Sequence, residues 1–278
     1  MTQGGRRDPG SVNELQRRIG RAAAARASTV KRLQSLVANV ALAQMLPACA
    51  VKGGTGLKLR FGDQMTRQTP DLDTAFRGDR TAFLTELHAN LVPGWGGFSG
   101  TAVEGRQRPP ARVPIAYVMR PLVVKLTFHR RPFATIDVEV GYDELEATTR
   151  EEPERELSAE VVELFAELGL GAPHPVPVLP LHHQIAQKLH ACTEPGNERA
   201  HDLVDLQLMA DAADDRIVAA TVRRLFAFRQ QHLWPAAVRP GPAWPGLYNQ
   251  AAEGLDVLPD LTPAVTWANV YIARLADL

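Results

Sequence analysis

Hydrophobic residues recur at helical spacing along the first third of the chain. From Ser11 to Leu46, alanine, leucine and valine return every three or four positions, which predicts one or two helices that end at Pro47. The pair Gly53-Gly54 then predicts a turn that opens a short helix. Helical spacing returns over residues 80–92. The N-terminal part of the chain is therefore expected to contain several helices.

Strand-like patterns lie between and after these helices. A short segment bounded by Pro70 and Gly78 predicts a strand at residues 71–75. Longer stretches predict further strands at 98–104, 113–119, 121–129 and 133–141, of which the last two form a hairpin. Helices combined with these strands indicate an α+β domain with a mixed sheet.

The pattern becomes helical again after a proline-rich segment. Residues 151–156 are acidic, and four prolines between 173 and 180 prevent a regular helix, so we predict an extended connector. Helical spacing then covers 181–192, 199–213, 215–232 and 262–277, with a loop rich in Pro, Gly and Trp at 235–246. We therefore expect an N-terminal domain at 1–150, a connector at 151–180 and a helical domain at 181–278.

The composition excludes several classes of protein. Hydrophobic residues make up 45% and charged residues 22% of the 278 positions, as in soluble globular proteins. No apolar run reaches the roughly 18 residues that span a bilayer. Cys49 and Cys192 are too few for a disulfide framework or a structural zinc site. We expect a cytoplasmic protein with no membrane partner.

The net charge of zero hides an uneven distribution. Residues 1–67 carry 12 Lys or Arg against three acids, so the rest of the chain is acidic. A second basic stretch, with no acid, lies between Glu104 and Asp137. Such stretches attract polyanions such as RNA, although a charge run is more often a solvated face.

Acidic residues in two predicted strands suggest a metal site. Asp71 and Asp73 lie at i and i+2, so on a strand their side chains share one face with Cα atoms about 6.5 Å apart. Two carboxylates so placed can bind Mg²⁺ and leave positions for phosphate oxygens. Asp137 and Glu139 alternate with apolar residues on another strand, which supplies a third carboxylate if it neighbours the first. Alone, each pattern is also typical of a solvated surface.

The order of these motifs resembles a known family. The motifs occur in a fixed order: Lys52-Gly53-Gly54-Thr55, then Arg67, Thr69, Asp71 and Asp73, then Lys188, then an R-x-x-D-x-x-D-L segment at 199–206. This order resembles the AbiEii/AbiGii-type nucleotidyltransferase toxins, including the MenT group, of type IV toxin–antitoxin systems. The resemblance covers residues 50–210. It departs at Gly54-Thr55, where the wider polymerase-β-like superfamily normally has Gly-Ser.

The resemblance implies a fold, a reaction and a set of site residues. The fold would be a polymerase-β-like domain with a helical C-terminal domain. Asp71, Asp73 and Asp137 would be catalytic metal ligands for Mg²⁺, and Lys188 would contact phosphate. The NTP would also be bound by residues of the glycine turn, the segment before the acids and the later helix: Lys52, Gly53, Gly54, Thr55, Arg67, Thr69, Asp202 and Asp205. Asp202 and Asp205 share a helix face, and we expect them to orient Lys188 or a bound base.

The implied activity is transfer of a nucleoside monophosphate from an NTP to the 3′ end of tRNA, which would block translation. A cognate antitoxin would be a further partner. Two alternatives remain open: a protein or small-molecule acceptor, and a module that binds a nucleotide without catalysis.

Overall fold

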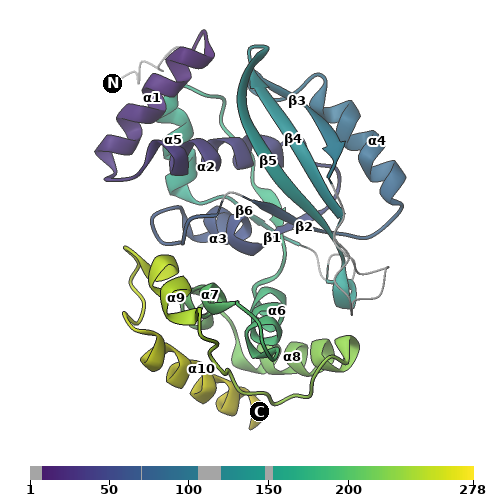
Figure 1. Ribbon diagram of the computed structural model, residues 1–278. Helices are drawn as coiled ribbons and strands as arrows, with labels where there is room; N and C mark the ends of the chain where they lie inside the picture. The colour runs from purple at the N-terminus through teal and green to yellow at the C-terminus, as the bar shows by residue number, and fades with distance from the viewer. Residues whose placement is uncertain (1–7, 70, 106–119, 148–152) are drawn as a thin grey trace. The chain divides into compact units, whose positions relative to one another are not determined.

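The chain divides into two compact units, each built from segments that are not continuous in sequence (Figure 1). A computed structural model describes residues 8–69, 71–105, 120–147 and 153–278. The first unit comprises Met1–Asp63, Gln68–Asp143 and Thr148–Val178, and the second comprises Gln64–Arg67, Glu144–Ala147 and Leu179–Leu278. The strand expected at 113–119 and the first part of the basic stretch before Asp137, residues 106–119, lie outside the described residues.

A seven-stranded mixed sheet forms the centre of the first unit, in the order β3-β4-β5-β2-β1-β7-β6. Strand β5 runs parallel to β2 and β7 runs parallel to β1, whereas the other neighbours are antiparallel. The expected mixed sheet is therefore confirmed. The strands are β1 (Ala50–Lys52), β2 (Leu72–Phe76), β3 (Phe98–Glu104), β4 (Arg120–Phe128), β5 (Arg131–Tyr142), β6 (Glu154–Glu156) and β7 (Val176–Val178).

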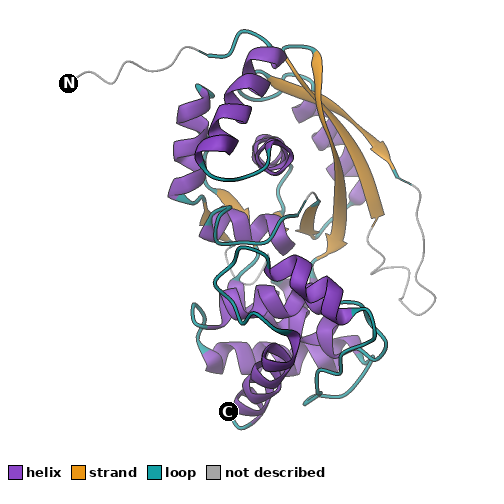
Figure 2. Ribbon diagram, turned by 60° about the vertical axis from the view of Figure 1, so that its left-hand side comes forward, coloured by secondary structure: helices purple, strands orange, loops and turns teal. Residues whose placement is uncertain are grey.

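Helices of the first unit cover one face of this sheet, and the opposite face of strands β3–β5 is open (Figure 2). Along β5, Ile136, Val138 and Val140 are buried, whereas the alternating residues Thr135 and Asp137 are exposed. This alternation places apolar side chains toward the helices and polar side chains on the open face. The helices are α1 (Val12–Ala25), α2 (Val30–Ala43), α3 (Gly53–Phe61), α4 (Arg80–Leu91) and α5 (Ala159–Leu168).

The range expected as a connector, 151–180, differs from that prediction because its described part belongs to the first unit. It contains β6, α5 and β7. Ser158 caps α5 by accepting a hydrogen bond from the Val161 amide, and Gly169 ends the helix in the left-handed conformation. The prolines flank this helix, and Pro177 lies within the short strand β7. Proline spacing alone therefore concealed one helix and two strands.

The second unit is helical, as expected. Its helices are α6 (Leu181–Thr193), α7 (Ala200–Ala210), α8 (Asp215–Arg229), α9 (Trp244–Ala252) and α10 (Leu261–Ala276). Helix α9 starts inside the range expected as a loop, since proline is tolerated in the first turn and Trp244 and Tyr248 bury one face. A short 3₁₀ segment, Glu144–Glu146, is also part of this unit. Among the described helices, none is long and apolar enough to cross a membrane.

Candidate functional site

The glycine turn and the acidic strand are in direct contact within the first unit. Gly53 is the first residue of α3 and has φ +62°, a conformation that favours glycine. A Cβ atom on Gly53 would lie 2.2 Å from Asp73 Oδ2, and one on Gly54 would lie 2.7 Å from Thr69 Cγ2. Only residues without a Cβ allow the turn to approach Asp73 and Thr69 this closely. The structure therefore brings together the two motifs that the sequence separates by sixteen residues.

Backbone pairing places three charged residues side by side across the sheet. Lys52 of β1 is opposite Asp73 of β2, and Asp73 is opposite Glu139 of β5. Residues paired in this way project from the same face. The Lys52 side chain extends over this row, because a Cβ on Gly141 would lie 3.0 Å from Lys52 Nζ. We call Lys52, Asp73 and Glu139 the charged row.

Asp71 lies just before β2 and is exposed. Buried polar groups hold its backbone through hydrogen bonds. Thr55 Oγ1 donates a hydrogen bond of 2.7 Å to the Asp71 carbonyl. The same hydroxyl accepts a hydrogen bond of 3.1 Å from Asn39 Nδ2. Thr55 is 1% exposed, and its hydroxyl holds the backbone of Asp71; the nucleotide contact expected of Thr55 stays a prediction.

The acid nearest to Asp73 in the register is Glu139, whereas the sequence reasoning selected Asp137 as the third acid. Asp137 lies two residues earlier on β5, on the same face, and is opposite Val123 of β4. The difference arises because strand register depends on packing and turns that a motif does not contain. Both acids are partly or fully exposed on the open face of the sheet.

The acids of the first unit suit a metal that shares its ligands with a substrate. Among the residues that the structure describes, no three His, Cys, Asp or Glu side chains are close enough to form a complete metal cage. Mg²⁺ does not require one, since it is usually held by one or two carboxylates together with phosphate oxygens and water. Asp71 and Asp73, on adjacent same-face positions with oxygen donors, fit that requirement.

A buried ion network forms the other half of the predicted site, within the second unit. Lys188 of α6 donates hydrogen bonds of 2.8 Å to Asp202 Oδ1 and 2.6 Å to Asp205 Oδ2, both on α7. Arg199 donates one of 2.7 Å to Asp202 Oδ2, and Arg67 donates one of 3.0 Å to Asp205 Oδ1. The two carboxylates are 0% exposed. We call these five residues the buried network.

The charges of the buried network hold one another in their ionised forms. Burial alone would lower the pKa of Lys188, but the Asp202 and Asp205 carboxylates outweigh it and raise that pKa above its ordinary value. Burial would raise the pKa of Asp202, yet Lys188 and Arg199 hold it well below its ordinary value. Three cations face two carboxylates, so the network carries an excess of positive charge.

This arrangement leaves Lys188 a limited capacity for a ligand. An ammonium group has three N–H donors, and the carboxylates accept two of them. The contact between Lys188 and Asp205 that the helix pattern predicted is present. Arg67, predicted to bind nucleotide, is 138 residues from Asp205 in sequence and forms an ion pair with it. No sequence signal identified that pair, nor the supporting contacts of Asn39.

Comparisons with known proteins agree with this geometry. Residues 34–269 match the family described as "Nucleotidyl transferase AbiEii toxin, Type IV TA system". A search of the curated proteins finds no match.

Solved structures with a similar chain path include two bacterial proteins. MenT4, a nucleotidyltransferase toxin of Mycobacterium tuberculosis H37Rv, aligns with a TM-score of 0.54 at 18% identity over 94% of this chain and 98% of its own. JHP933 from Helicobacter pylori aligns with a TM-score of 0.45 at 15% identity over 87% of this chain and 89% of its own. At this identity, the likeness to MenT4 supports the fold.

Proposed function

We propose that this chain, which belongs to the AbiEii nucleotidyltransferase toxin family of type IV toxin–antitoxin systems, transfers a nucleoside monophosphate from an NTP to the 3′ end of tRNA and so blocks translation. The observation that carries the proposal is the contact between the glycine turn and the acidic strand, where Gly53 lies against Asp73. The turn opens helix α3, and unpaired backbone amides at such a helix start bind phosphate. Phosphate-binding amides beside metal-binding carboxylates are what nucleotidyl transfer requires.

The reaction exchanges a phosphoanhydride bond of the NTP for a phosphodiester bond to the acceptor. The acceptor hydroxyl oxygen forms a bond to the α-phosphorus, the bond from the α-phosphorus to the bridging oxygen breaks, and pyrophosphate leaves. The hydroxyl proton goes to a carboxylate of β5, and we assign this role to Glu139 or Asp137, which share one face of that strand. Bound at Asp71 and Asp73, Mg²⁺ would supply positive charge to the phosphate oxygens.

Other residues of the first unit hold the triphosphate in place. Lys52 Nζ, positioned over the charged row, is suited to a phosphate oxygen as a point charge. Gly53 and Gly54 contribute backbone amides, and Thr69, buried against Gly54, fixes the segment that leads to Asp71.

We assign the buried network a positioning role and a single phosphate contact. Asp202 and Asp205 fix the Lys188 ammonium, whose third N–H is available to a phosphate oxygen. Arg199, with half of its side chain exposed, adds positive charge at the edge of the network. A cognate antitoxin completes the system as a partner of the toxin.

Labelled nucleotides test the proposal directly. The protein is incubated with each α-³²P-labelled NTP, Mg²⁺ and total tRNA, and the RNA is separated on a denaturing gel. We expect label in tRNA with at least one NTP, loss of the label on chelation of the metal, and loss in Asp71→Ala. Asp277→Ala, a change of an exposed aspartate in the second unit, is the matched control and should retain the wild-type signal.

The same gel separates the proposal from its alternatives. Label in a protein band or in a small molecule, with unlabelled tRNA, would assign a different acceptor to the same chemistry. Absence of labelled RNA with all four NTPs would contradict the proposal.

A further inference from the structure

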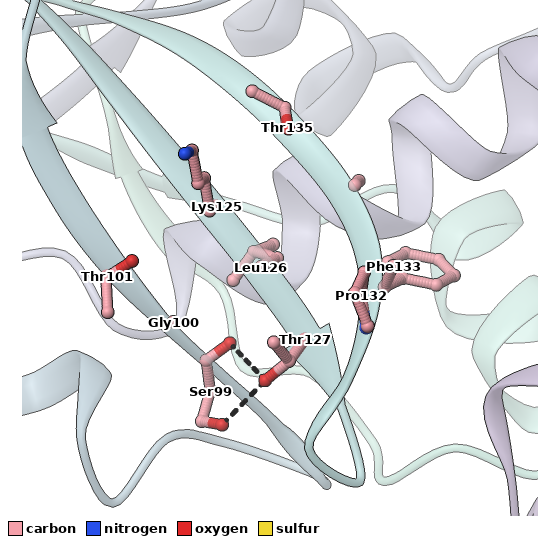
Figure 3. Close-up of a pocket in the computed structure, with 10 residues that line it drawn as sticks. Ser99, Gly100, Thr101, Lys125, Leu126, Thr127, Pro132, Phe133 and Thr135 are labelled. Carbon is pink, nitrogen blue, oxygen red and sulfur yellow. Dashed lines mark hydrogen bonds between the residues drawn. The ribbon is translucent and has the colours of Figure 1, made fainter.

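A groove crosses the open face of the sheet, away from the glycine turn (Figure 3). Its volume is about 640 Å³, and it lies across strands β3, β4 and β5 near their hairpin end. The side chains of these strands that alternate onto the open face are mostly hydroxyls around a single lysine. They are Ser99, Thr101, Lys125, Thr127 and Thr135.

The lysine of the groove stands between two threonines. Lys125 of β4 is opposite Thr101 of β3 on one side and Thr135 of β5 on the other, as Figure 3 shows. Lys125 is exposed and makes no ion pair with any described residue. In the next pair along the strands, Ser99 Oγ and Thr127 Oγ1 share a hydrogen bond of 2.9 Å. Among the described residues, the groove therefore presents a cation without an ion-pair partner beside neutral hydroxyl groups.

The groove lies on the same face of β5 as Asp137 and Glu139. Thr135, Asp137 and Glu139 follow one another on the same face of β5. Four residues of strand separate Thr135 from Glu139, or about 13 Å at 3.3 Å per residue. A nucleic-acid strand in a duplex carries a phosphate about every 3.4 Å of axis, so this span corresponds to about four nucleotides, or fewer in a stretched strand.

The residues between the groove and the charged row suit a sugar or a base better than a phosphate. Val103 and Val123 are paired on this face, beside Asp137. Val103 is 49% exposed, so apolar surface is presented to solvent there. A phosphate would be repelled by Asp137 but attracted by Lys125, so charge fixes where along the path a phosphate can lie.

We propose that the groove binds the phosphodiester backbone of the acceptor RNA near its 3′ end, with Lys125 as the phosphate contact. The inference rests on the proposed function, which requires an RNA end to reach the charged row. Lys125 donates to a phosphate oxygen, and the hydroxyls of Thr101 and Thr135 on either side of it donate to phosphate or ribose oxygens. Because Lys125 has no carboxylate partner in the described structure, no ion pair must break when the RNA binds.

Salt-dependent RNA binding tests the inference without requiring catalysis. The probe is a fluorescein-labelled 12-nucleotide single-stranded RNA, titrated with the full chain from 50 to 200 mM KCl and followed by fluorescence anisotropy. In Lys125→Gln we expect about fivefold weaker binding at 50 mM and a log–log salt slope smaller by about 0.7, the value for one phosphate contact on a single strand. The matched control is Arg216→Gln, a change of an exposed arginine on α8 outside both basic stretches, which should leave both quantities at wild type.

A second pair of variants reverses the charge of the groove without removing Lys125. Thr101→Glu places a carboxylate opposite Lys125, and Thr101→Gln is its neutral control of similar size. We expect about tenfold weaker binding in the first and less than twofold in the second. Unchanged melting temperatures verify that the fold is intact. Wild-type affinity and salt slope in both Lys125→Gln and Thr101→Glu would overturn the inference.

The outcomes also separate this inference from the function on which it rests. If wild type labels tRNA, Lys125→Gln should raise the KM for tRNA about fivefold and leave the KM for NTP unchanged. If wild type labels tRNA but Lys125→Gln binds RNA as wild type does, RNA binding in the groove is rejected and the transfer reaction is not. If wild type labels no RNA but the salt slope of RNA binding is smaller in Lys125→Gln, the result supports RNA binding in the groove and rejects the transfer reaction.

Discussion

The acids of the first unit and the buried network of the second unit differ in how their charged groups are exposed and paired. Asp71 is exposed and Asp73 is half-buried. Both lie at the start of β2, where Gly53 has no side chain to cover Asp73. Asp202 and Asp205 are 0% exposed and are matched by Lys188, Arg199 and Arg67. The first set lies where solvent and a ligand can reach it. The second set has its neutralising partners built in.

The difference indicates how each set responds to substitution. An exposed carboxylate contributes little to stability, so its replacement should be felt in catalysis. A buried charge whose partner is removed is left uncompensated, which costs about 3–5 kcal/mol. We therefore expect the first unit to separate activity from stability, and the second unit to couple them.

The largest expected effect is on catalysis, in Asp73→Asn. The substitution keeps the side-chain size but removes a charge that would hold the metal, so transfer of label to tRNA should fall at least about 1000-fold. The free energy of unfolding from urea titration should change by less than about 0.5 kcal/mol. A variant that loses several kcal/mol of stability together with its activity would contradict the separation proposed for the first unit.

The next effect is on stability, in Lys188→Met. Removing the ammonium leaves Asp202 and Asp205 without their shared partner, and we expect a loss of about 3 kcal/mol of unfolding free energy. Arg199→Met is the matched control, because its side chain is 50% exposed and its ion pair should contribute no more than about 1 kcal/mol. Equal losses in both variants would show that burial does not govern the network.

A comparison of two acids on β5 sharpens the description of the first unit. Glu139 is opposite Asp73 in the register and Asp137 is two residues away, so Glu139→Gln should reduce the rate of transfer about tenfold more than Asp137→Asn. Single-turnover rates at saturating NTP measure this ratio. The reverse order would return the proton-accepting role to Asp137.

The last expected effect is a pH dependence of stability that originates in the second unit. Burial, with Arg229 and His232 nearby, lowers the pKa of His190 to about 3, and Arg229 donates to its Nδ1. When the pKa of a histidine is lower in the folded state, its contribution to the free energy of unfolding is fully present above the unfolded pKa of 6.5. That contribution is lost as the pH falls toward 3. The slope is at most about 1.4 kcal/mol per pH unit. Melting curves from pH 7 to 4 should show this decline in wild type and a weaker one in His190→Phe.

The sequence predicted local structure and local chemistry better than it predicted partners. The strand at 98–104 and the helix opened by Gly53-Gly54 follow from short-range patterns, and both are present in the structure. Helix α5 was missed because the prolines on either side outweighed its own Ser158 and Gly169 caps. Short elements carry the weakest sequence pattern, as the three-residue strands β1, β6 and β7 illustrate.

Contacts between distant segments were beyond the sequence for a physical reason. The choice between Asp137 and Glu139 depends on strand register, which a one-residue slip would invert. The pair of Arg67 with Asp205 joins segments 138 residues apart, and neither residue carries a signal of the other. By contrast, the Arg199 and Asp202 pair follows from helical spacing of three residues.

The discontinuous make-up of the two units has a consequence for synthesis on the ribosome. Segments 64–67 and 144–147 belong to the helical unit, whose remaining residues begin at Leu179. Chains emerge from the N-terminus at about 5–20 residues per second, so Arg67 must wait several seconds for Asp205 to be translated. A nascent or prematurely terminated chain that stops before Lys188 contains every acid of the first unit but none of the helix residues that complete the buried network. The buried network can therefore form only after Asp205 has been synthesised, when most of the chain has been made.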